Sequence, residues 1–165
     1  MKIEDIKKDL IEAQKSQNEI AVSVLRMLLS SIVNKQKDKR LYIAAHESGL
    51  TEVDLDRREK LDDNEIMEAI ISEAKKRRDS IFSFEEGSRP DLVEREQKEL
   101  DFLKKYLPVE LTESEIRKIV EDVIAKLETV GQKNIGLVMK EVIPQTKGRA
   151  DGYLVGKIVK EMIGE

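Results

Sequence analysis

Apolar side chains recur at steps of three and four residues along most of the chain. Residues 3–13 carry this spacing, which is typical of an amphipathic helix. Between residues 19 and 32 the apolar positions are denser and cover most of a helix circumference, which predicts a central helix buried on several sides. The same spacing predicts two further helices, over residues 62–86 and 90–107.

Start and stop signals give the boundaries of these helices. Asp62 or Asp63 is the candidate N-cap of one helix, and Gly87 is predicted to end that helix in a left-handed conformation. Pro90 suits the first turn of the next helix, which Pro108 cannot continue. We therefore expect the N-terminal part to be helical throughout its apolar segments.

Residues 34–61 lose the helical periodicity. A run of charged residues and a turn signal at Ser48-Gly49 favour a solvated helix extension followed by a mobile loop. The single histidine, His46, falls in this polar stretch.

The last third of the chain has the pattern of three short amphipathic helices. A capping-box sequence begins the first helix at Thr112, Pro144 is expected to cut the second, and Asp151 is placed to cap the third. One apolar stripe on each helix implies a compact bundle. The sequence thus predicts an all-α protein with a helical N-terminal domain over residues 1–110 and a C-terminal three-helix bundle over residues 111–165.

Composition excludes several kinds of chemistry. The 165 residues include no Cys and one His, so disulfides, thiolate metal sites and Cys nucleophiles are ruled out, and we expect no metal and no cofactor. Aromatic residues make up 4% of the chain, too few for an extended surface that stacks unpaired bases. The N-terminus lacks a signal-peptide core, and no stretch approaches about 18 apolar residues. We therefore expect a cytoplasmic protein with no membrane partner.

Positive charge concentrates near the C-terminus, although the net charge of the chain is −4. Within residues 132–160, the two acidic residues are outnumbered by six basic ones, Lys133, Lys140, Lys147, Arg149, Lys157 and Lys160. Three of these, Lys140, Lys147 and Arg149, flank the connector before the last helix, where backbone N–H groups and the helix dipole favour phosphate. The pattern predicts a local patch that binds phosphates of folded RNA.

Two interpretations of the connector itself stay open. Gly148 can belong to the binding site, or it can serve only as a left-handed C-cap. On that second, architectural interpretation, Asp151 only caps the last helix and Ala150 only packs. The sequence shows no structural requirement for the basic residues of the patch.

Charged residues of the N-terminal part have structural explanations. Arg26 lies in an otherwise apolar helix, so we expect an internal ion pair with Asp79 or Asp91. The basic run over residues 75–78 spreads around its helix, which favours a solvated or salt-bridged face over a single binding surface.

Several segments, in the same order along the chain, resemble the YqeY-like proteins. In the N-terminal part they are Arg26-Met27-Leu28-Leu29-Ser30, Arg77-Arg78-Asp79-Ser80-Ile81 with Phe84, Gly87-Ser88-Arg89-Pro90-Asp91-Leu92, Glu99-Leu100 and Tyr106-Leu107-Pro108. Residues 135–140, which include Gly136, and residues 147–152 resemble the family's C-terminal signature, shared with the tail of the GatB subunit of tRNA-dependent amidotransferases. The segment over residues 41–60 is longer than the corresponding segment of the family pattern.

The resemblance implies tRNA binding more directly than catalysis, because the GatB tail is implicated in holding tRNA. It also implies a carbon–nitrogen ligase with glutamine as amido-N-donor. This chain could catalyse such a ligase reaction only with other subunits, since it has no Cys nucleophile and no glycine-rich phosphate loop. We therefore expect an accessory tRNA-binding protein, with an amidotransferase component or a helical protein-interaction module as alternatives. The expected partners are tRNA and an amidotransferase or aminoacyl-tRNA synthetase.

Overall fold

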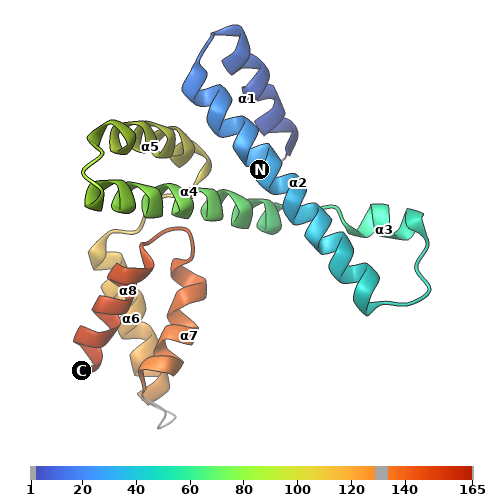
Figure 1. The fold of residues 1–165 in the computed structure, drawn as a ribbon. Helices are drawn as coiled ribbons and strands as arrows, with labels where there is room; N and C mark the ends of the chain where they lie inside the picture. The colour runs from blue at the N-terminus through green and yellow to red at the C-terminus, as the bar shows by residue number, and fades with distance from the viewer. Residues whose placement is uncertain (1–2, 129–133, 165) are drawn as a thin grey trace. The chain divides into compact units, whose positions relative to one another are not determined.

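The fold is all-α, as the sequence predicts. The structure is a computed structural model that describes residues 3–128 and 134–164. Over these residues it contains eight α-helices, one short 3-10 helix and no strand (Figure 1). The chain divides into two compact units, Met1–Tyr106 and Leu107–Glu165. Independent domains that meet at residue 110 stay a prediction.

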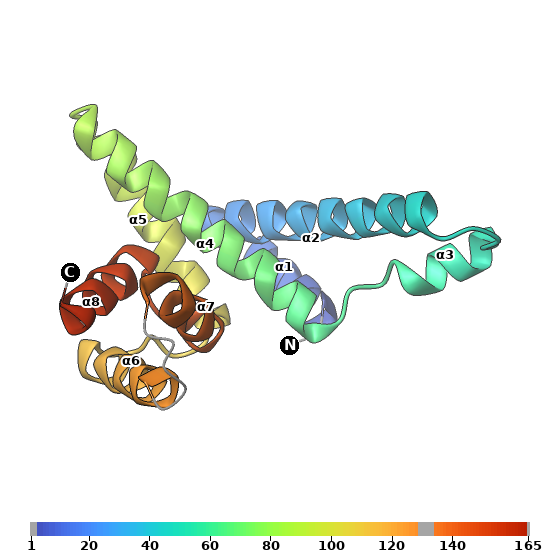
Figure 2. The same cartoon turned by 90° about the horizontal axis from the view of Figure 1, so that it is seen from below.

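Four helices build most of the N-terminal unit. α1 (Ile3–Lys15) packs along α2 (Glu19–His46), and α4 (Asp63–Glu86) lies beside α5 (Pro90–Leu103), as Figures 1 and 2 show. A 3-10 turn, η1 (Lys104–Tyr106), ends this unit. The predicted central helix is confirmed, because α2 contributes much of the core through Ala21, Val24, Leu25, Leu28 and Ile32.

The predicted helix extension after residue 34 is confirmed, but part of the expected mobile loop is a further helix. α2 continues to His46, and after a short connection α3 (Glu52–Arg58) begins at the N-cap Thr51. The periodicity is lost here because α3 and the part of α2 after residue 34 bury little of their surface. Ile43 and Leu55 are the buried apolar residues of residues 34–61.

Ion pairs supply the remaining contacts between α2 and α3. The guanidinium of Arg40 pairs with Asp56 at 2.5 Å and with Glu59 at 2.8 Å. The side-chain amide of Gln36 donates a hydrogen bond to Glu59 at 2.7 Å. The charge run that removed the apolar pattern therefore holds α3 against α2.

The turn between α4 and α5 corrects one predicted stop signal. Asp62 is the N-cap of α4 and Pro90 is the first residue of α5, in agreement with the sequence. Gly87, however, has a φ of −77°, and the left-handed residue is Ser88, with a φ of 54°. A Cβ on Gly87 would lie 3.3 Å from the carbonyl oxygen of Ser83, so the glycine permits a close backbone approach.

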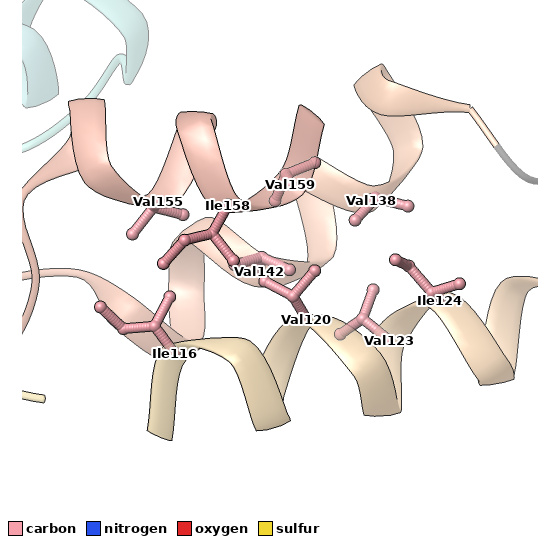
Figure 3. Packing of buried hydrophobic residues seen from close by; sticks show 9 residues of the cluster. All are labelled: Ile116, Val120, Val123, Ile124, Val138, Val142, Val155, Ile158 and Val159. Carbon is pink, nitrogen blue, oxygen red and sulfur yellow. The ribbon is translucent and has the colours of Figure 1, made fainter. Parts of the chain in front are cut away.

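The C-terminal unit is a bundle of α6 (Glu113–Glu128), α7 (Ile135–Thr146) and α8 (Gly152–Ile163), each of which packs on the other two. Figure 3 shows their side chains meeting in one apolar core. Its buried members are Ile116, Val120, Val123, Ile124, Val138, Val142, Val155, Ile158 and Val159.

Pro144 does not end α7, contrary to the sequence prediction. The helix continues through Pro144 to Thr146. The missing N–H of Pro144 would have reached the carbonyl of Lys140, and both of these residues are exposed, so water can satisfy that carbonyl. The buried hydroxyl of Thr146 donates to the carbonyl of Val142 at 3.1 Å and supports the last turn.

Candidate functional site

The connector between α7 and α8 has a fixed backbone geometry. Gly148 adopts a left-handed φ of 74°, which glycine accepts without the strain of a Cβ. Asp151 is the N-cap of α8, and its carboxylate accepts from the backbone N–H of Tyr153 at 2.9 Å and of Leu154 at 3.1 Å. Gly148 and Asp151 therefore have architectural roles, while a role in binding stays a prediction.

Arg149 also has a structural role, which the sequence analysis missed. Its carbonyl accepts a hydrogen bond from the N–H of Leu111 at 2.6 Å. Its Nε donates to the carbonyl of Val109 at 3.2 Å. Hydrogen bonds from Thr112 lower the pKa of Glu115, and the positive charge of Arg149 adds to that effect. Arg149 thus fastens the connector to the segment that precedes α6.

The lysines of the patch lie mostly in solvent. Lys140, Lys147 and Lys157 are exposed. Lys140 lies on α7, and Lys147 is the C-cap residue directly after that helix. Lys157 lies 4.0 Å from Glu161 on its own helix. Lys133 lies outside the described residues, and the convergence of the other basic residues on one ligand stays a prediction.

Packing explains the position of Ala150 but not that of Gly136. Ala150 is half-buried and packs against the core of the three-helix bundle. Gly136 is exposed in the first turn of α7, where a Cβ would make an ordinary contact of 3.4 Å with the side chain of Asn134. The packing of the C-terminal unit therefore does not require a glycine at position 136.

The expected internal ion pair of Arg26 is wrong. Arg26 is exposed and forms no ion pair with another residue of the described chain. Of its two expected partners, Asp79 is exposed and Asp91 pairs with Arg89 at 2.8 Å. The buried arginine of this unit is Arg77 instead.

Arg77 lies at the centre of a buried ionic cluster that joins α4 to α5. Its side chain contacts Glu73 at 3.2 Å and Glu99 at 3.1 Å, and all three residues are 3–5% exposed. Lys76 forms a further ion pair with Glu73 at 2.7 Å, and Arg95 forms one with Glu99 at 3.6 Å. The run over residues 75–78 is therefore salt-bridged as expected, but around a buried centre.

A groove of about 370 Å³ opens beside this cluster, which we call the Arg77 groove. It is bordered by α2, α4 and α5, and its lining includes Ser23, Arg77, Phe84, Leu92 and Glu96. Burial raises the pKa of Glu96, and the neighbouring carboxylate of Glu99 adds to the rise. The groove therefore combines apolar walls with several charged groups.

Two features are absent from residues 3–128 and 134–164, namely a cluster of metal-ligating side chains and a helix that could span a membrane. Nowhere in these segments do three or more His, Asp or Glu side chains gather as a metal site would require. None of the helices in the same segments combines the length and the apolar character needed to cross a bilayer.

Curated relatives match most of the chain. It is 31% identical to the protein "Altered inheritance of mitochondria protein 41, mitochondrial" of Pyrenophora tritici-repentis, over 94% of this chain and 77% of the relative. The proteins of the same name from Lachancea thermotolerans and Saccharomyces cerevisiae strain YJM789 are 30% and 32% identical, over 90% and 84% of this chain and 70% and 66% of the relatives.

These relatives correct one expectation and establish the family. Their names place them in mitochondria, which overturns the expected cytoplasmic location. That expectation rested on the missing signal-peptide core, which bears on secretion and not on organelles. A family model described as "Yqey-like protein" matches residues 3–163, so the chain belongs to the YqeY-like family.

Proposed function

We propose that this YqeY-like protein binds folded tRNA through the basic residues around the α7–α8 connector. The observation that carries the proposal is the exposure of Lys140 on α7 and of Lys147 at the C-cap of that helix, next to a connector held by the left-handed Gly148 and the cap of Asp151. A preformed site loses little conformational entropy when it binds. Arg149 and Lys157 extend the positive surface along the connector and α8.

The charge distribution supports phosphate as the ligand. Residues 132–160 carry six basic and two acidic residues. Of the two carboxylates, that of Asp151 is occupied by the cap of α8. Each lysine that contacts a phosphate releases condensed counterions, so the affinity should depend strongly on salt.

The finer assignment, an accessory protein of the GatB-tail type, rests on the family resemblance of the segments on both sides of the connector. We propose binding rather than catalysis by this chain alone, because its 165 residues contain no cysteine nucleophile. An amidotransferase or an aminoacyl-tRNA synthetase is the proposed protein partner on the same bound tRNA.

Salt-dependent titration with bulk tRNA tests the proposal. The variant Lys140→Gln/Lys147→Gln removes two proposed phosphate contacts and keeps every hydrogen bond of the connector described above. The expected result is weaker binding and a plot of log affinity against log salt whose slope is smaller by roughly 1.5–2 units. The matched control, Lys8→Gln/Lys118→Gln, makes the same charge change at exposed lysines on α1 and α6.

Equal loss in the two double variants would show that net charge alone drives binding, and would overturn the proposed site. Tight binding by the Lys140→Gln/Lys147→Gln variant would overturn it as well. Capture of a defined protein partner that is indifferent to ribonuclease, without tRNA binding, would favour the helical protein-interaction module.

A further inference from the structure

The Arg77 groove carries more carboxylate than its buried cation can balance. Glu73 and Glu99 share the one buried guanidinium of Arg77, and the half-buried carboxylate of Glu96 lines the same groove. Glu96 forms no hydrogen bond or ion pair within the described residues. The charges of Arg77 and Arg95 only partly offset the effect of burial on this carboxylate. A cation in direct contact with Glu96 would therefore be favourable.

The cations at the rim of the groove, Lys76 and Arg95, compensate this negative charge only in part. Lys76 and Arg95 pair with Glu73 and Glu99, and their side chains are 64% and 69% exposed. Solvent screens the cation of each pair, so its attraction to the buried carboxylate is weaker than that of a fully buried cation. The groove beside these carboxylates is therefore suited to a cationic group that enters from solvent.

The guanidinium of Arg77 adds an unused donor to the groove. Its Nη1 and Nη2 atoms contact the two carboxylates, but its buried Nε has no hydrogen-bond partner within the described residues. Nη2 also contacts the sulfur of Met27 at 3.8 Å. Met27 is 52% exposed, and its flexible side chain can move aside to let a better acceptor reach this edge of the guanidinium.

Apolar side chains form the remaining wall. Phe84 at the end of α4 and Leu92 at the start of α5 are both half-buried and line the groove. The volume of about 370 Å³ lies at the lower end of the roughly 300–1,000 Å³ of small-molecule sites. The groove thus presents a carboxylate, an N–H donor and an apolar wall.

We propose that the Arg77 groove binds a primary ammonium group with a carbonyl on the adjacent carbon and an apolar side chain. Glu96 receives the ammonium, the edge of the Arg77 guanidinium beside Met27 donates to the carbonyl once Met27 has moved aside, and Phe84 and Leu92 contact the side chain. The N-terminal residue of a peptide and a free amino acid amide share this chemistry. The proposed site lies in the N-terminal unit and does not depend on the proposed tRNA site.

Titration of the full chain with leucinamide, followed by protein amide chemical shifts, tests the proposal. We expect saturable shifts at residues around the Arg77 groove. N-acetyl-leucinamide keeps the carbonyl and the side chain but lacks the positive charge, and it should bind at least tenfold more weakly. The tripeptide Leu-Ala-Ala distinguishes the two sources, because tighter binding than leucinamide indicates a peptide N-terminus, and weaker binding indicates a free amino acid derivative.

A variant pair assigns the carboxylate. Glu96→Gln should weaken leucinamide binding at least fivefold, while Glu86→Gln, an exposed carboxylate on α4 outside the groove, should leave it unchanged. Far-UV circular dichroism checks that both variants are folded. Equal binding of the acetylated probe, equal loss in the two variants, or no saturable shift with leucinamide would each overturn the proposal.

Discussion

Replacing Arg77 by methionine is expected to destabilise the N-terminal unit strongly. The arginine is 3% exposed and lies between the carboxylates of Glu73 and Glu99, at 3.2 Å and 3.1 Å. Methionine fills much of the same space with an apolar chain. The main effect is therefore to leave two buried carboxylates without the cation between them.

The size of the loss follows from the partners that remain. Removing one member of a buried ion pair costs about 3–5 kcal/mol. Here Glu73 keeps Lys76 at 2.7 Å and Glu99 keeps Arg95 at 3.6 Å, although both of these cations are mostly in solvent. We therefore expect the free energy of unfolding to fall by about 3 kcal/mol, the lower end of that range.

Urea unfolding followed by circular dichroism measures the loss, and hydrogen exchange locates it. Peptides of α4 and α5 should exchange much faster in the variant, while peptides of α6, α7 and α8 should keep the rate of the unchanged protein. The matched control is Arg26→Met, because Arg26 is the exposed arginine on α2. The control should change the stability by no more than about 0.5 kcal/mol.

A fall in the free energy of unfolding of less than about 1 kcal/mol for Arg77→Met would refute the reasoning, because leaving two buried carboxylates without their cation should cost more than that. A second variant guards against a general packing defect. Arg77→Met combined with Glu73→Leu and Glu99→Leu removes all three charges, and it should recover most of the stability. If this triple variant is less stable than Arg77→Met, loss of packing and not unpaired charge explains the effect.

Local contacts in both units give three smaller effects. The Tyr106 hydroxyl and Lys105 hold the pKa of Asp9 in the folded protein below its ordinary 3.8. Their contribution to the free energy of unfolding is therefore present above about pH 4, and it is lost as the pH falls through the folded pKa. Tyr106→Phe should thus cost about 1 kcal/mol at neutral pH and much less near pH 2, measured by urea unfolding at both. Gly148→Ala should destabilise the C-terminal unit by about 1 kcal/mol in thermal unfolding, because its φ is 74°. Asp151→Ala should cost a similar amount, about 1 kcal/mol, and should speed hydrogen exchange in the first turn of α8.

The helices were predictable where the signal is local. Apolar spacing located every long helix, and the caps at Asp62 and Asp151 involve backbone N–H groups two or three residues away. The helix α3 was expected as a mobile loop, because ion pairs with α2 replace an apolar stripe there. Such pairs join residues far apart in the sequence, which a spacing argument does not reach.

Arg77 and Arg26 show the same limit of an argument from residue spacing, which does not reach contacts between helices. Arg77 follows Ala74 by three residues and Ile70 by seven, so its position on the apolar face of α4 was available from the sequence. Its second carboxylate, Glu99, is on another helix, and only the packing of α4 on α5 brings the two together. Arg26 was expected inside because α2 is rich in apolar residues, yet one side of α2 is open to solvent.

Arg149 has both a proposed role in phosphate binding and a structural role in the connector, so an experiment must separate the two. Its Nε holds the backbone of Val109, while its Nη atoms make no hydrogen bond within the described residues and can reach a phosphate. Arg149→Ala would loosen the connector and remove a charge together, so weaker tRNA binding would have two explanations. Arg149→Lys keeps the charge but loses the Nε contact. If its affinity falls while the salt slope stays unchanged, the loss is architectural; a smaller slope would mean that the guanidinium itself contacts phosphate.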